Sequence, residues 1–168
     1  MALSFYDISI PVFLRGLGQL SHILDKGLAH AQATGIEPGT LVEARLAPDM
    51  LTLAGQVQRA SDASKLGAAR VAGITAPSFE DNETRYEELQ ARVAKTVDFL
   101  KTIDRAQVDG AEHRPVMLKV RDTQIEFTAE RYLLQFALPN FFFHVTTAYD
   151  VLRHRGVPIG KLDYLGRF

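Results

Sequence analysis

Apolar residues recur every three or four positions along most of this chain, a spacing that places them on one face of an α-helix. The first such stretch runs from Ser4 to Thr34 and ends at TGIEPGT, where glycine and proline stop a helix. Its apolar stripe consists of Phe13, Leu17, Leu20, Leu24 and Leu28. A helix with one apolar face has to bury that face against another element, so the pattern predicts partner helices.

Two further helices are predicted in the first two thirds of the chain. One begins near Pro48, and its inward face is made mostly of small residues, which let two helices approach closely. The next opens with PSFED, where Ser78 is a plausible N-cap and Asp81 favours the positive end of the helix. The apolar side of this third helix includes Phe79, Tyr86, Leu89, Val93, Val97 and Leu100. Its opposite side is expected to be solvated and carries Arg85, Glu88, Arg92 and Lys95.

The helical period fails between Asp104 and Glu130, where apolar and polar residues alternate in HRPVMLKVRDTQIEFTAE. This alternation predicts a short β-hairpin, which has to pack on the helices because an isolated hairpin is marginal in water. A fourth helix is expected from about Glu130 to His154, with a kink or break at Pro139. The apolar residues of the tail are expected to dock on the helices. They are Ile159, Leu162, Tyr164 and Leu165.

These elements predict an all-α fold, a four-helix bundle with a short β-hairpin inserted before the last helix, in a single domain over residues 1–168. The 168 residues are enough for one hydrophobic core. The formal net charge is −1 and the basic residues are scattered, so no nucleic-acid partner and no membrane surface are expected. Cysteine is absent and the first ten residues do not resemble a secretory signal, so a cytoplasmic location is expected.

Candidate functional residues gather on the last predicted helix. A projection at 100° per residue places Asn140, His144 and Thr147 on the inward stripe with Leu133 and Val151. A buried imidazole needs partners for its nitrogens, which other helices must supply. The candidate partners are Asp49 and Gln56 on the second helix and His30 on the first. His144 is therefore a hydrogen-bonded core residue, part of a ligand pocket or a metal ligand.

Several segments resemble a bacterial family without an assigned function, DUF1993. They are LSFYDISIPVFLRGL, LDKGLAHA, EARLAPDM, LPNFFFHVTTAYDVLRHRGVPIGK and DYLG, and they span nearly the whole chain. That family is similar in fold to the DinB/YfiT-like four-helix bundles. The resemblance implies a fold in which many relatives bind a divalent metal through three histidines, some activate a thiol cofactor in transferase or isomerase chemistry, and many form homodimers.

The resemblance implies a ligand set that only partly matches this chain. His144 corresponds to the first histidine of the H-x-x-x-H pair on the last helix, but Ala148 stands at the second position. The second helix has no histidine, and Gln56 or Asp49 occupies that region.

Three functions are therefore expected as alternatives. The first is a module that binds a small polar ligand, or a vestigial relative of the metal-dependent transferases and isomerases, with a pocket near His144, Asn140, Thr147, Gln56 and Asp49. The second is an enzyme that holds a divalent metal through His30, Asp49 and His144. The third is a non-catalytic interaction protein whose working form is a homodimer.

Overall fold

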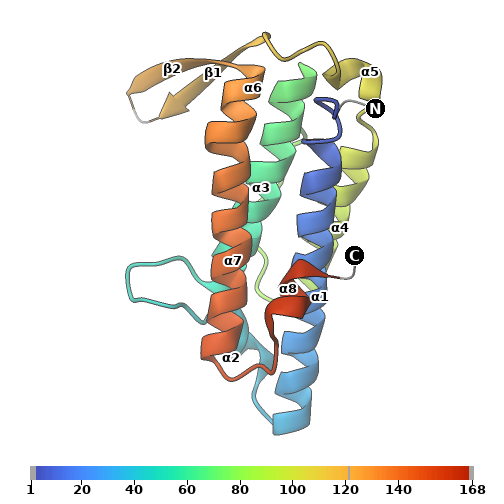
Figure 1. Cartoon of the computed structure of the whole chain (residues 1–168). Helices are drawn as coiled ribbons and strands as arrows, with labels where there is room; N and C mark the ends of the chain where they lie inside the picture. The colour runs from blue at the N-terminus through green and yellow to red at the C-terminus, as the bar shows by residue number, and fades with distance from the viewer. Residues whose placement is uncertain (1–2, 121, 167–168) are drawn as a thin grey trace.

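Four long helices stand side by side in the part of the chain that the computed structural model describes, residues 3–120 and 122–166 (Figure 1). They are α1 (Ile10–Thr34), α3 (Leu53–Ala72), α4 (Tyr86–Lys101) and α7 (Leu138–His154). A two-stranded hairpin, β1 (Pro115–Val120) and β2 (Thr123–Thr128), precedes the last of them. The predicted fold class, a helical bundle with a hairpin inserted before its last helix, is confirmed.

Five short elements connect or cap these helices. They are α2 (Pro38–Val42), α5 (Arg105–Val108), α6 (Ala129–Tyr132), the π-helical turn η1 (Leu133–Ala137) and α8 (Lys161–Leu165). The sequence pattern did not indicate α2, which begins at a proline and is capped by the Glu37 carboxylate. No helix in residues 3–120 or 122–166 is long and apolar enough to cross a membrane.

The predicted core face of α1 is buried. Phe13, Leu17, Leu20 and Leu24 have no exposed surface. The helix begins at Ile10 rather than Ser4, because Pro11 occupies its first turn and residues 5–8 form a separate turn closed by Ser9, whose hydroxyl donates to the carbonyl oxygens of that turn.

The predicted start of the second long helix near Pro48 was wrong. The α3 helix begins at Leu53, because the hydroxyl of Thr52 accepts the backbone N–H of Gly55 and caps it. Residues 43–52 form a projecting loop, which Arg45 stabilises by donating to the carbonyl oxygens of Pro48 and Met50. The close packing expected of the small-residue face is present. At Gly67, an added Cβ would lie 3.0 Å from Phe13 Cζ.

The third long helix also begins later than its sequence suggested. Ser78 and Asp81 lie in an extended connection, and α4 begins at Tyr86. The Glu88 carboxylate accepts the backbone N–H groups of Thr84 and Arg85 at 2.8 and 3.1 Å and so satisfies the helix start. These two residues also lower the pKa of Glu88 to about 2.

The last helix is interrupted as predicted, and the interruption takes the form of a π-helical turn. The backbone N–H of Leu138 donates to the carbonyl oxygen of Leu133, five residues back, just before Pro139. Proline lacks an N–H and its ring clashes with the preceding turn, so a wider turn accommodates it. The hairpin packs next to this turn through Val116 and Leu118, which are buried.

The C-terminal tail docks on the bundle only in part. Ile159 is buried, and the hydroxyl of Tyr164 bonds to that of Thr146 at 2.8 Å. Leu162 is 73% exposed, so its predicted burial was wrong. The short α8 helix turns that side chain away from the α1 helix on which it packs.

Replacing Tyr86 with phenylalanine is expected to stabilise the protein by about 1 kcal/mol. The Tyr86 hydroxyl is buried against Gly27 and, among the described residues, is a buried side-chain polar atom without a hydrogen-bond partner. Burial also raises the pKa of this phenol. Removing the hydroxyl removes an unmet desolvation cost and leaves the ring in place.

Tyr132→Phe is the matched control, because the Tyr132 hydroxyl accepts a hydrogen bond from Arg70 at 2.7 Å. Its loss should destabilise the protein by about 1 kcal/mol. Denaturant unfolding of both variants beside the unmodified protein measures the difference, and a loss of stability in Tyr86→Phe would contradict the expectation.

Candidate functional site

The structure brings together two of the residues singled out in the sequence, His144 on α7 and Gln56 on α3. Nδ1 of His144 lies 2.8 Å from Oε1 of Gln56. The Gln56 side chain is buried at 2% exposure, whereas His144 is half-buried. The two helices run in opposite directions beside each other (Figure 1), which places the first turns of α3 beside the middle of α7.

The environment of Gln56 determines which nitrogen of His144 carries the proton. The amide nitrogen of Gln56 donates to the carbonyl oxygen of Leu51 at 3.4 Å, and a carbonyl oxygen can only accept. The amide oxygen of Gln56 therefore faces His144 and accepts a hydrogen bond from Nδ1–H. The neutral imidazole then has its lone pair on Nε2, which has no hydrogen-bond partner within residues 3–120 and 122–166.

Two effects lower the pKa of His144 below its ordinary value. The larger is desolvation by burial, which disfavours the charged imidazolium, and the second is the positive charge of Arg59 on the neighbouring helix. Both effects favour the neutral ring at neutral pH. The site therefore offers a neutral imidazole with an available acceptor nitrogen, which can accept a hydrogen bond or act as a general base.

Asn140 lies one helical turn before His144 and is half-buried. Its side chain lines a pocket of about 210 Å³ together with Arg59 and residues further along α3 and the last helix. Thr147 is 5% exposed, and its hydroxyl donates to the carbonyl oxygen of Phe143 at 2.7 Å. The Thr147 hydroxyl therefore bonds to its own helix and, among the described residues, forms no hydrogen bond with His144.

The predicted metal ligands do not come together. Asp49 lies exposed in the 43–52 loop rather than on a helix, and His30 lies on α1 without a hydrogen bond or ion pair to His144 in the described segments. Residues 3–120 and 122–166 contain no group of three His, Cys, Asp or Glu side chains that could hold a metal ion. Moreover, Nδ1 of His144 is engaged by an amide. These donors do not fit a zinc-type site of three or four ligands.

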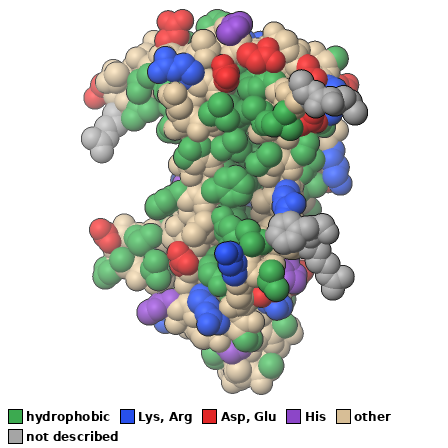
Figure 2. All heavy atoms as spheres, in the orientation of Figure 1, with side chains coloured by type: hydrophobic (Ala, Val, Ile, Leu, Met, Phe, Trp, Pro, Cys, Tyr) green, Lys and Arg blue, Asp and Glu red, His purple; other side chains and the backbone are tan. Residues whose placement is uncertain are grey.

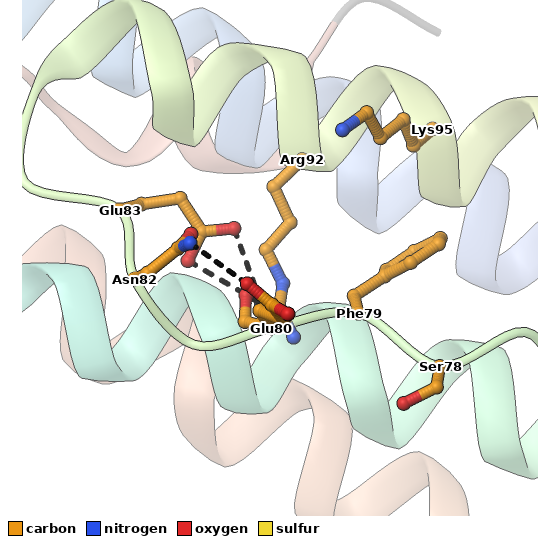
Figure 3. Close-up of a pocket in the computed structure, with 7 residues that line it drawn as sticks. All are labelled: Ser78, Phe79, Glu80, Asn82, Glu83, Arg92 and Lys95. Carbon is orange, nitrogen blue, oxygen red and sulfur yellow. Dashed lines mark hydrogen bonds and ion pairs between the residues drawn. The ribbon is translucent and has the colours of Figure 1, made fainter.

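Sequence reasoning missed a cluster of charged side chains that surrounds Arg92. Its predicted place on a solvated face was wrong, because Arg92 is 2% exposed. Figure 3 shows its side chain extending from α4 toward the connection that contains residues 78–83. The Arg92 guanidinium pairs with Asp62, Asp81 and Glu83 at 3.0, 2.8 and 3.1 Å.

The Arg92 cluster extends to the helix that carries Gln56. Asp62 also pairs with Lys65 at 3.1 Å, and Arg59 pairs with Asp81 at 3.2 Å. Three cations thus face three carboxylates, which fastens the 74–85 connection to α3 and α4. A pocket of about 270 Å³ with Arg92 and Lys95 in its lining lies beside the cluster (Figure 3). The cations of this cluster are occupied by carboxylates, so its geometry is that of a structural clamp.

The helical bundle with a hairpin before its last helix is that of a DinB-like protein. The family model described as "Domain of unknown function (DUF1993)" matches residues 5–165. The chain belongs to this family. The bundle also resembles the crystal structure of a DinB family member protein from Shewanella denitrificans, with a TM-score of 0.88 and 36% sequence identity. That match covers 97% of this chain and 92% of the other.

The chain is also similar to the cysteine–tRNA ligase of Sinorhizobium medicae (strain WSM419), with 30% identity over 121 residues. The match covers 66% of this chain but only 26% of the ligase. The chain therefore spans about a quarter of the length of that curated relative, a share too small to assign the activity of the ligase to it.

Proposed function

We propose that this DinB-like chain is a small-ligand-binding module, a vestigial relative of metal-dependent bundles, in which His144 accepts a hydrogen bond from a polar ligand. The observation that carries the proposal is the His144–Gln56 hydrogen bond, whose orientation leaves Nε2 as an acceptor. A ligand with a hydroxyl, amide or thiol donor suits this nitrogen. The incomplete set of metal donors around His144 favours this function over a metal-dependent enzyme.

His144 is expected to be neutral and protonated on Nδ1 at pH 7. Long-range ¹H–¹⁵N correlation spectra distinguish the two tautomers of each ring, and the pH dependence of the shifts gives the pKa. We expect a pKa below 6.5, the ordinary value for histidine. The replacement Gln56→Glu places a carboxylate beside Nδ1 and should raise that pKa by ~1–3 units. Gln135→Glu, on an exposed position, is the control and should leave it unchanged.

The lowered pKa of His144 also makes the stability of the protein depend on pH. The unfolded chain takes up its proton near pH 6.5, and the folded chain does so only at lower pH. The contribution of His144 to stability is therefore complete above pH 6.5 and is lost as the pH falls below that value toward the folded-state pKa. The unfolding free energy of His144→Gln should accordingly fall less steeply across this range than that of the unmodified protein.

Binding itself is tested with small probes, because the natural ligand is unidentified. Ethylene glycol, acetamide and 2-mercaptoethanol should shift the Nε2 resonance of His144 and the amide of Asn140 at millimolar concentration. In His144→Phe the shift of the Asn140 amide should disappear, and His154→Ala, at an exposed histidine on the same helix, should preserve both shifts. Protonation of His144 on Nε2, or shifts that survive His144→Phe, would refute the binding function.

A homodimer is the second candidate, and exposed apolar side chains on α7 and in the 43–52 loop favour it. Phe143 is 57% exposed beside His144, and Leu46 and Leu51 in the 43–52 loop are also exposed. Exposed apolar patches of this kind mark association surfaces. Light scattering after size-exclusion chromatography tests it, and a monomer at micromolar concentration would exclude it. The expected cytoplasmic location stays a prediction.

A further inference from the structure

At the other end of the α3–α7 face, the structure has a second polar feature, which the His144 site does not use. Arg70 lies near the C-terminal end of α3, 14 residues after Gln56, or about 21 Å along the helix axis. Its guanidinium donates to the hydroxyl of Tyr132 at 2.7 Å and lies 5.5 Å from the centre of that ring. Tyr132 is itself buried at 1% exposure. The guanidinium is therefore held in a defined position.

Arg70 differs from the arginines of the Arg92 cluster, which are paired with carboxylates. Within residues 3–120 and 122–166, Arg70 has no carboxylate partner, although it is half-buried. The Tyr132 oxygen accepts from Arg70, so its O–H is left to donate, and no acceptor for it is found in the same segments. A fixed cation and a hydroxyl donor thus lie together without an anion, and partly buried charges are normally paired.

Arg70 and Tyr132 line the pocket of about 210 Å³ that also includes Asn140. Most of the remaining lining is apolar and comes from the hairpin, α3 and the π-helical turn, through Leu118, Leu66 and Phe136. The hairpin and the 43–52 loop project on the same side of the molecule, which is hollowed between them (Figure 2). Widened helical turns such as η1 are frequent at functional sites.

Among the described residues, Arg70 supplies the one positive charge of the lining that has no carboxylate partner. The lining also contains Arg59 and Asp62, which pair with each other at 3.5 Å, and Arg59 pairs with Asp81 as well. Asp62 is neutralised by Lys65 and Arg92 from outside the pocket, at 3.1 and 3.0 Å, so it does not oppose an anion at the Arg70 end. The available volume is smaller than the ~300 Å³ at which pockets for drug-sized ligands begin, so the occupant has to be small.

We propose that this pocket binds a small carboxylate with an aromatic or branched apolar body. Arg70 pairs with the carboxylate, the Tyr132 hydroxyl donates a second hydrogen bond to it, and the apolar body packs on Leu66, Leu118 and Phe136. The fork of an arginine side chain matches the two oxygens of a carboxylate. The site does not depend on His144, and the two proposals can fail separately.

The experiment uses phenylacetate as the probe, with phenylacetamide as its neutral counterpart and inorganic phosphate as an anion without an apolar body. The side-chain Nε–H resonance of Arg70 and the backbone amides of residues 132–138 and of Asn140 are followed by NMR. Phenylacetate should shift these resonances in a saturable manner. Phenylacetamide lacks the carboxylate and phosphate lacks the apolar body, so each should bind at least about ten-fold more weakly.

Arg70→Gln should weaken phenylacetate binding by about ten- to a hundred-fold, and Tyr132→Phe by a smaller factor of about three to ten. Arg131→Gln is the matched control, because Arg131 is exposed, adjacent to Tyr132 in sequence and outside the pocket. His144→Phe should leave the affinity unchanged, which separates this site from the His144 site. Equal binding of phenylacetate and phenylacetamide, equal losses in Arg70→Gln and Arg131→Gln, or no saturable shift would overturn the proposal.

Discussion

Replacing Arg92 with methionine should lower the free energy of unfolding by about 3 kcal/mol, the largest effect expected of a single side chain here. Methionine preserves most of the length and packing of the side chain but removes its charge. Asp62, Asp81 and Glu83 would then face one another without the cation that lies between them. The value is at the low end of the range for broken buried ion pairs, because these carboxylates keep some contact with water.

Lys95→Met is the matched control for Arg92→Met. Lys95 lies on the same helix, three residues further on, and lines the same pocket, but it is exposed and forms no ion pair in the described part of the chain. The control should change stability by less than ~0.5 kcal/mol. Urea unfolding measures both, and hydrogen exchange of residues 76–84 should rise only in Arg92→Met. Equal effects of the two variants would show that the buried network does not stabilise the fold.

Two glycines two residues apart on α1 should respond to alanine with opposite signs. Gly16 is buried. A Cβ added there would clash with two ring atoms of Phe141, Cε1 and Cζ, and would lie 2.7 Å from Cζ. Phe141 has no exposed surface and packs edge-on against Phe13 at 5.2 Å, so it has no room to move aside. Gly16→Ala should therefore destabilise the protein by about 1–3 kcal/mol despite the better helix propensity of alanine.

Gly18 has open space around its Cα, with nothing within 4 Å of an added Cβ. Gly18→Ala should therefore stabilise the protein by about 0.5–1 kcal/mol, since alanine loses less backbone entropy in a helix. Thermal and denaturant unfolding of the two variants measure the difference. Stabilisation by Gly16→Ala would mean that the contact between α1 and α7 at Phe141 is looser than the structure indicates, and destabilisation by Gly18→Ala would contradict the open space around that residue.

The helix periodicity was sufficient to predict the bundle, because each long helix buries a stripe of apolar or small side chains at helical spacing, such as that of Leu17, Leu20 and Leu24. Helix starts were less predictable. Ser78 has the residue type of an N-cap, but the acceptor that actually satisfies the start of α4 is Glu88, inside the helix. A local signal cannot distinguish between two such starts when the intervening residues are held elsewhere by Arg92.

The burial of Arg92 could not be predicted by a projection that assigns charged residues to the solvent. Its partners come from α3 and from the connection before α4, and only the folded chain brings these three carboxylates to one cation. The pairing of His144 with Gln56 was within reach, because both residues lie on inward faces of helices that pack together. Asp49 was not separable from Gln56 by sequence, because that distinction depends on where α3 begins.

The π-helical turn at residues 133–137 has a consequence for how this bundle tolerates insertions and deletions. It contains one residue more than an α-helix needs for the same rise, and each residue of an α-helix corresponds to a rotation of about 100°. Deleting one residue there would restore regular pairing and swing Tyr132, with the hairpin before it, about a quarter turn around the helix axis relative to α7. The direction in which the hairpin projects from the bundle is therefore encoded by a single surplus amino acid rather than by the strands themselves.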